Sequence, residues 1–241
     1  MELLCELRRA IARGEVGAVD VLADLACTSP EAAECLVEAI PIGGQNVLKA
    51  LAELRREYPR HQGVTLRLLA ALQAATDAEA RLALLEALER HGDETAVPAL
   101  VDLLEGPEVV EAALALGRVG SARAGSSLAA VLEAEVNRPS SPRLEQLVEA
   151  AARLECIEAT VALARAALAG SGPAYRYLWQ QRKLLAAGLA QPEYRRLVLE
   201  TYIEFPKLTD PAAVTRLLDS PDGEVSRLAA RAMASADWAW H

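Results

Sequence analysis

Apolar residues recur along the chain at intervals of three or four, the spacing of one face of an α-helix. The clearest stretch runs from Ala83 to Leu132. Its two outer segments, ALLEALERHGDETAVPALVDLL and EAALALGRVGSARAGSSLAAVL, are both 22 residues long and place a glycine turn between two apolar helices. A third copy without the glycine runs from Leu147 to Leu168. Such recurrence of a helix–turn–helix unit predicts a stacked helical solenoid.

The boundaries of the predicted helices follow from caps and from a recurring X-Pro start. Ser29-Pro30-Glu31 is typical of a helix N-terminus, because Ser caps free amides and Pro needs no partner at the first position. Similar starts appear at 106–108, 141–142, 172–173, 191–192 and 210–211. The predicted helices span 2–13, 16–27, 30–40, 46–58, 62–75, 77–91, 94–105, 107–119, 122–135, 142–155, 157–169, 173–189, 191–205, 211–219 and 223–236. The longest predicted loop is 136–141.

The composition favours an all-α protein. Of the 241 residues, 52% are hydrophobic, mostly Ala, Leu and Val, and only 4% are aromatic. Ala and Leu are strong helix formers, and Ala lets helices approach closely. We expect six alanines to pack helices onto neighbouring layers: Ala112, Ala113, Ala150, Ala151, Ala229 and Ala230. Leu104 and Leu116 are predicted core residues.

The net charge and the cysteine spacing disfavour several classes of protein. A formal charge of −9 argues against a nucleic-acid reader, which normally presents a basic face. The four cysteines, Cys5, Cys27, Cys35 and Cys156, form no CxxC pair, and each is expected to be a small buried thiol. No secretory signal or membrane-spanning run is predicted, so a cytoplasmic protein is expected. The Ala-, Arg- and Leu-rich composition is compatible with a GC-rich bacterial genome.

Two stretches resemble HEAT repeats. Thr95–Gly120, TAVPALVDLLEGPEVVEAALALGRVG, is similar to the HEAT pattern of a Pro-containing first helix, a Leu-Leu ending and a second helix ending Ala-Leu-Gly-x-aliphatic-Gly. Ala213–Ala234, AVTRLLDSPDGEVSRLAARAMA, resembles another repeat. The resemblance implies an all-α, right-handed superhelix of stacked antiparallel helix pairs, an armadillo-like solenoid. We expect a single domain over 1–241, with divergent helices in 1–75, clearer repeats in 77–236 and a tail at 237–241.

A segment rich in aromatic and basic residues is the most distinctive candidate site. Tyr175–Phe205 holds six of the nine aromatic residues, interleaved with Arg and Lys. Tyr, Trp and Arg often anchor interfaces, so the segment is interpreted as a binding surface. The alternative is that the aromatics fill a gap between irregular repeats and the basic residues form a solvated face. The candidate residues are Tyr175, Arg176, Trp179, Arg182, Lys183, Arg195 and Arg196.

Two further features have a functional and a structural interpretation. Trp238 and Trp240 in the C-terminal tail are candidates for partner binding, or they cover the end of the solenoid. An acidic run at 15–38 includes Glu15, Glu34 and Glu38, and a second run extends from Asp93 to Glu111. Both runs could meet a basic partner segment, although solvated helix faces and favourable first-turn charges account for most such runs.

The sequence gives no catalytic, cofactor or metal site. The histidines, His61, His91 and His241, are not followed by Glu, so the repeated His-Glu pairs of the HEAT-type iron hydroxylases are absent. No HExxH, GxSxG, P-loop or GxGxxG motif occurs. Cys156 has no sequence-adjacent basic partner that would activate it. We therefore expect neither catalysis nor a cofactor.

The leading hypothesis is a non-enzymatic scaffold or adaptor that binds another protein on the solenoid surface. The main alternative is a nucleic-acid-binding protein resembling the HEAT-like DNA glycosylases, with Trp179 and nearby basic residues on the strand. A third hypothesis resembles the HEAT-like phycobilin lyases and requires a chromophore-sized pocket. The sequence does not identify the partner, the pathway or the oligomeric state.

Overall fold

A computed structural model describes residues 2–53, 62–138 and 141–239 of the chain. The described residues form α-helices and short 3-10 helices and contain no β-strand, which confirms the all-α solenoid class. They form two compact units, Met1–Val119 and Gly120–His241. The single-domain boundary of 1–241 stays a prediction. Within the described residues, no helix is long and apolar enough to cross a membrane.

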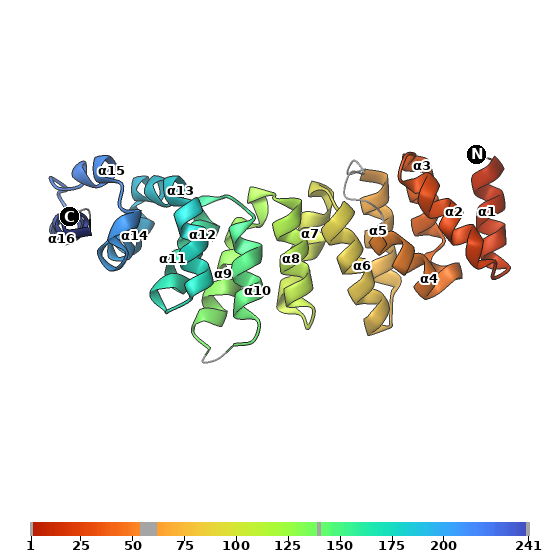
Figure 1. Cartoon of the computed structure of the whole chain (residues 1–241). Helices are drawn as coiled ribbons and strands as arrows, with labels where there is room; N and C mark the ends of the chain where they lie inside the picture. The colour runs from red at the N-terminus through yellow and green to blue at the C-terminus, as the bar shows by residue number, and fades with distance from the viewer. Residues whose placement is uncertain (1, 54–61, 139–140, 240–241) are drawn as a thin grey trace. The chain divides into compact units, whose positions relative to one another are not determined.

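The first unit contains the helices labelled α1 to α8 in Figure 1, and the contacts between them define two rows. The first row contains α1 (Glu2–Ala12), α3 (Pro30–Glu38) and α5 (Gln62–Ala74), which pack against one another in that order. The second row contains α2 (Val16–Ala26), α4 (Ile40–Glu53), α6 (Ala78–His91) and α8 (Val109–Val119). Between α6 and α8 lie η1 (Glu94–Ala96), α7 (Val97–Asp102) and η2 (Leu103–Glu105). Each helix therefore buries one face on its pair and another on the next layer.

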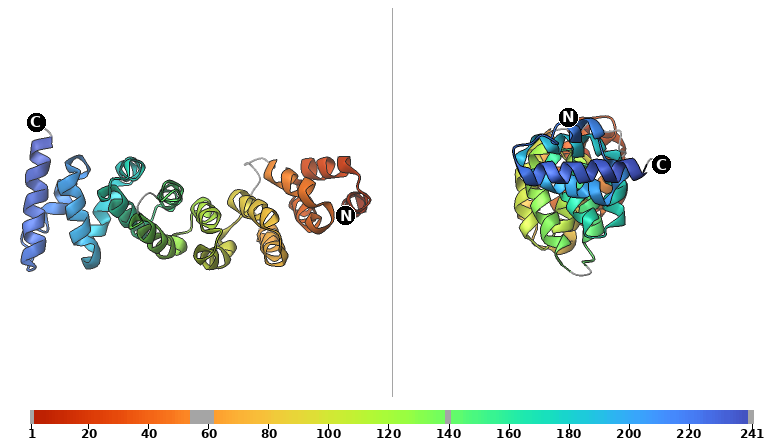
Figure 2. Two further views of the ribbon diagram at one scale, coloured as in Figure 1. Left: turned by 90° about the horizontal axis from the view of Figure 1, so that it is seen from below. Right: turned by 90° about the vertical axis from the view of Figure 1, so that its left-hand side faces the viewer.

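The second unit, coloured green to blue in Figure 2, also forms two rows of helices, but one row is interrupted between α12 and α13. One row consists of α9 (Gly125–Val136), α11 (Ile157–Leu168), α14 (Pro192–Glu204) and α16 (Gly223–Ala239). The other side has α10 (Leu144–Ala152), α12 (Gly172–Gln180), α13 (Arg182–Ala187) and α15 (Pro211–Thr215). Three 3-10 helices connect these elements: η3 (Ala122–Ala124), η4 (Gly188–Ala190) and η5 (Pro206–Leu208). Two short helices, α12 and α13, occupy the place of the single straight helix that a regular helix pair would have.

Local sequence signals place most helix starts. Ser29 accepts a hydrogen bond from the Ala32 amide at 3.3 Å, with Pro30 in the first position of α3. Asp210 caps α15 by accepting hydrogen bonds from the amides of Ala212 and Ala213. Two predicted starts are displaced, because Pro107 and Pro142 lie in turns: α8 begins at Val109 and α10 at Leu144.

Several predicted helices have different limits in the structure. The predicted helix 173–189 is wrong as a single helix, because Gln181 separates α12 from α13. The predicted helix 211–219 is too long, because α15 ends at Thr215 and a turn follows. The predicted break between 40 and 46 is a kink within α4, where Gly44 has a φ of 51° that favours glycine. The predicted helix 46–58 extends into 54–58, which lie outside the described residues.

The predicted core is largely confirmed. Leu116 is fully buried and Leu104 retains 6% exposure. Five of the six predicted packing alanines are buried, whereas Ala230 is exposed, because it lies on the outer face of α16. The prediction that each cysteine is buried is wrong for Cys5 and Cys27, which are exposed, and right for Cys35 and Cys156.

Candidate functional site

The aromatic residues of 175–205 serve different purposes in the structure. Tyr202 is fully buried in α14, and burial raises the pKa of its hydroxyl above the ordinary range. The rings of Tyr175 and Phe205 contact each other in a tilted arrangement with centroids 4.9 Å apart, which links the start of α12 to the end of α14. Trp179 differs from both, because 42% of its side chain is exposed. The segment thus supplies core and surface together, and sequence spacing alone does not separate the two.

Exposed basic residues surround Trp179. Arg176 precedes it by three residues in α12, so the two side chains share a helix face. The Arg182 guanidinium lies 5.5 Å from the centroid of the Trp179 ring, a cation–π geometry, and Nη1 donates a hydrogen bond to the Trp179 carbonyl at 3.2 Å. Lys183 is also exposed. We call Arg176, Trp179, Arg182 and Lys183 the Trp179 surface.

The cations of the Trp179 surface lack acidic partners in the part of the chain that the structure describes. Arg176, Arg182 and Lys183 make no ion pair there. The other two basic candidates are engaged internally. Arg195 donates a hydrogen bond to the Leu189 carbonyl at 2.9 Å, which secures the end of η4. Arg196 forms ion pairs with Glu200 at 2.9 Å and Glu224 at 3.2 Å, which link α14 to α16.

A polar anchor fixes the junction that presents the Trp179 surface. The Gln181 amide nitrogen Nε2 donates to the Ala152 carbonyl at 2.5 Å. Its oxygen Oε1 accepts a hydrogen bond from the Thr160 hydroxyl at 2.7 Å. Thr160 is fully buried, and its hydroxyl also lies 2.8 Å from the Cys156 carbonyl. Gln181 therefore connects the α12–α13 break to α10 and α11. No sequence pattern indicates this role, because the partners of Gln181 are remote in sequence.

The tail candidates are only partly described. Trp238 lies in the last turns of α16. Trp240 lies outside the described residues. The predictions that these tryptophans bind a partner or cover the end of the solenoid remain untested.

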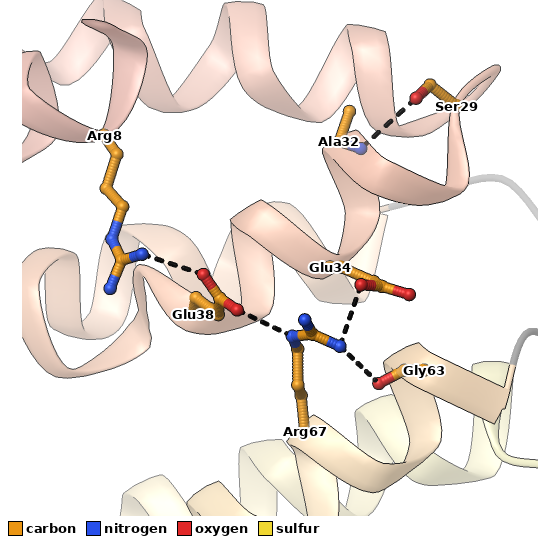
Figure 3. Close-up of polar contacts among 7 residues, drawn as sticks. All are labelled: Arg8, Ser29, Ala32, Glu34, Glu38, Gly63 and Arg67. Carbon is orange, nitrogen blue, oxygen red and sulfur yellow. Dashed lines mark hydrogen bonds and ion pairs between the residues drawn. The ribbon is translucent and has the colours of Figure 1, made fainter. Parts of the chain in front are cut away.

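Two residues of the acidic run at 15–38, Glu34 and Glu38, form contacts within the first unit (Figure 3). Glu38 lies between two arginines from neighbouring helices: Arg8 of α1 at 2.8 Å and Arg67 of α5 at 2.8 Å. Arg67 also contacts Glu34 at 2.8 Å, and the hydrogen bond to Glu38 raises the pKa of its guanidinium. The ion pairs connect α1, α3 and α5 in register. Glu34 and Glu38 are therefore neither simple solvated acids nor free to receive a basic partner.

A second group of acidic side chains in the first unit lines a groove. It lies between α6 and α8 and has a volume of about 430 Å³. Leu82 and Leu114 line it together with four glutamates: Glu79, Glu86, Glu89 and Glu111. The acidic run expected at 93–111 contributes only Glu111, and the others come from α6. Within the described residues, no group of three or more His, Cys, Asp or Glu could hold a metal ion.

Comparison with known proteins identifies one family match. Residues 65–140 match the HEAT repeats family, which covers η1–η2, α6–α9 and most of α5. A search of curated proteins finds no match. Among solved structures, an engineered protein from the Northeast Structural Genomics Consortium is 20% identical, with a TM-score of 0.47 over 98% of this chain and 68% of that one. A designed armadillo repeat protein in complex with the peptide (KR)4 is 16% identical, with a TM-score of 0.47 over 98% of both chains. At these scores the solved structures add nothing to the fold assignment.

Proposed function

We propose that this chain of stacked helices, which matches HEAT repeats over residues 65–140, is a non-enzymatic scaffold or adaptor that binds another protein on the Trp179 surface. Stacked helical repeats offer extended surfaces for partners, since each layer adds solvent-facing helix positions to those of its neighbours. The proposal concerns the second unit alone, because all four residues of the Trp179 surface lie on α12 and α13.

The observation that carries the proposal is the exposed Trp179 ring with Arg182 beside it. An aromatic side chain with 42% exposure still has apolar area to bury, and Trp and Arg are the residue types that contribute most to interface affinity. Arg182 lies beside the ring and makes no ion pair in the described residues, so part of the conformational entropy cost of binding is already met. The contact is thus preorganised for a ligand that covers both groups.

The unpaired cations indicate the chemistry of the partner. Three positive charges that make no ion pair within the described residues attract a segment that carries Asp or Glu next to an apolar side chain. Such a segment would place carboxylates on Arg176, Arg182 or Lys183 and cover the open face of the Trp179 ring. Arginine can bind a carboxylate with two parallel hydrogen bonds, which adds geometric selectivity.

Nucleic acid is the competing ligand for the same groups. Phosphates would contact the basic side chains, and an unpaired base could stack on Trp179. Two features favour protein over nucleic acid: the formal charge of −9, and the hydrogen bond of Arg195 to the Leu189 carbonyl, which keeps this arginine out of a longer basic track.

The test compares the native protein with the double variant Arg176→Ala and Trp179→Ala as baits in source-cell lysate. The matched control is Arg216→Ala, because Arg216 is an exposed arginine of the same unit without an ion pair in the described residues. We expect one protein to be recovered stoichiometrically by the native chain and the control, and lost from the double variant. Equal recovery of the partner protein by all three baits would show that the Trp179 surface does not bind it.

A gel shift with fluorescein-labelled single-stranded DNA at low salt separates the two ligand classes. The scaffold proposal predicts no shift for any of the three proteins. A shift that weakens steeply with salt and disappears when Arg182 and Lys183 are both replaced by Ala would favour the nucleic-acid alternative instead.

A further inference from the structure

The groove between α6 and α8 combines an apolar floor with an acidic rim. On α6, Glu79, Leu82, Glu86 and Glu89 follow one another at intervals of three or four residues and so share one helix face. On α8, Glu111 and Leu114 are spaced by three residues and line the opposite side of the groove. At 1.5 Å per residue, the α6 stripe is about 15 Å long.

The apolar part of this groove is accessible to solvent. Leu82 is 42% exposed, although it belongs to a helix whose neighbouring positions Leu84 and Leu85 are buried almost completely. Leu114 is half-buried on the facing helix. Two leucines on opposite walls leave an open apolar strip where one side chain of a ligand could be covered. Burial of apolar area is the main non-directional source of binding free energy.

The glutamates that line the groove favour a positively charged ligand. Glu79 and Glu111 make no ion pair among the residues that the structure describes. Glu86 pairs with Arg90 at 2.6 Å, but both side chains are substantially exposed, at 50% and 39%, so the pair is screened and exchangeable. Arg90 and Arg118 lie in the last turns of α6 and α8, away from the N-terminal glutamates. Among the residues that the structure describes, no Lys or Arg lines the groove itself.

We propose that the α6–α8 groove is a second binding site, which takes a short basic segment of another protein with an apolar side chain between its cations. Extended chain advances about 3.3 Å per residue, so a groove of about 15 Å accommodates roughly five residues. Leu82 and Leu114 contact the apolar side chain, while Glu79 and Glu111 receive cations from the two sides. The site lies in the first unit, so it is independent of the Trp179 surface.

The groove and the Trp179 surface would select ligands of opposite charge. An adaptor with one acidic and one basic site recognises two different segments without competition between them. The electrostatic complementarity also raises the association rate of each correct ligand and disfavours the wrong one.

The experiment measures fluorescence anisotropy of a labelled, acetylated and amidated peptide of sequence RLRRLR with the full chain. We expect binding that weakens as salt increases. The double variant Glu79→Gln and Glu111→Gln should lose about tenfold in affinity, because neutral amides keep the shape and remove the charge. Leu82→Ser should lose affinity by a similar factor, and a peptide with Ser in place of both Leu should bind the native protein as weakly.

The matched control is the double variant Glu94→Gln and Glu105→Gln. Both residues are exposed acids of the same unit outside the groove, so the change in net charge is identical. An equal loss of affinity in this control would mean that the peptide responds only to overall charge, and the proposed site would be wrong. Equal binding of the peptide ELEELE would lead to the same conclusion.

Sedimentation velocity tests the other occupant, a second copy of the chain. The proposal predicts that Glu79→Gln with Glu111→Gln leaves the oligomeric state of the native protein unchanged. Self-association of the native chain that these substitutions abolish would assign the groove to a second copy and overturn the proposed heterologous segment. Unchanged melting midpoints for all variants establish that altered binding does not result from unfolding.

Discussion

Replacement of Gln181 by Ala tests whether the polar anchor holds the α12–α13 break in place. The substitution removes the hydrogen bond from Nε2 to the Ala152 carbonyl and the one accepted by Oε1 from Thr160. Thr160 keeps the Cys156 carbonyl as an alternative acceptor, so the Ala152 carbonyl suffers the main loss. A net hydrogen bond is worth about 0.5–1.5 kcal/mol and an unsatisfied carbonyl adds to the cost, so we expect a destabilisation of about 1–2 kcal/mol.

Urea unfolding followed by tryptophan fluorescence measures this effect in the correct unit. All three tryptophans, Trp179, Trp238 and Trp240, belong to the second half of the chain, so their emission reports on the unit Gly120–His241. Gln180→Ala is the matched control, because Gln180 is the exposed neighbour with the same side chain. If both variants had the same free energy of unfolding, the anchor would contribute nothing net and its assignment would be refuted.

Three further predictions concern the core and its pH dependence. Leu116→Asp should lower the free energy of unfolding by more than about 4 kcal/mol, because it creates an unpaired charge at a fully buried position. The control Leu66→Asp, at a position that is 53% exposed, should leave the free energy of urea unfolding almost unchanged. Gly125→Ala should cost about 1–3 kcal/mol because its Cβ would lie 2.5 Å from the Cys156 sulfur, and a double-mutant cycle with Cys156→Ala should recover most of this loss. Burial lowers the pKa of His91, so the unfolded chain takes up a proton before the folded chain does as the pH falls below about 6.5. The free energy of unfolding should therefore decline from that pH downward, and the decline should be shallower in His91→Gln. Identical pH profiles for the two proteins would contradict the burial of a neutral His91.

The sequence predicted the fold where local signals decide the structure. The period of the apolar residues, the Ser29-Pro30 start and the glycine turns identified most helices, and the HEAT resemblance over 95–120 lies within the matched family region. The prediction of one helix at 173–189 failed because Gln181 interrupts it through hydrogen bonds to residues more than twenty positions away. Helical periodicity contains no information about such remote partners.

The sequence predicted which residue types make up the candidate site, but not which of these residues lie together. Sequence grouped Arg176, Trp179 and Arg182 with Arg195 and Arg196 as one basic, aromatic segment. The structure divides them, because Arg195 donates a hydrogen bond to the Leu189 carbonyl and Arg196 forms ion pairs with Glu200 and Glu224. Arg176 and Arg182 make no ion pair in the described residues. The α6–α8 groove escaped detection because its glutamates are spread over two helices and a run of acids in sequence does not show which helix face they share.

The most direct test of the scaffold account is affinity purification from source-cell lysate, with quantitative mass spectrometry, of the native chain beside the variant Arg176→Ala with Trp179→Ala. The account predicts one protein enriched in stoichiometric amounts by the native chain and reduced at least tenfold by the variant, with Arg216→Ala behaving as native. An identical set of proteins with all three baits, or recovery of nucleic acid in place of a protein, would contradict it.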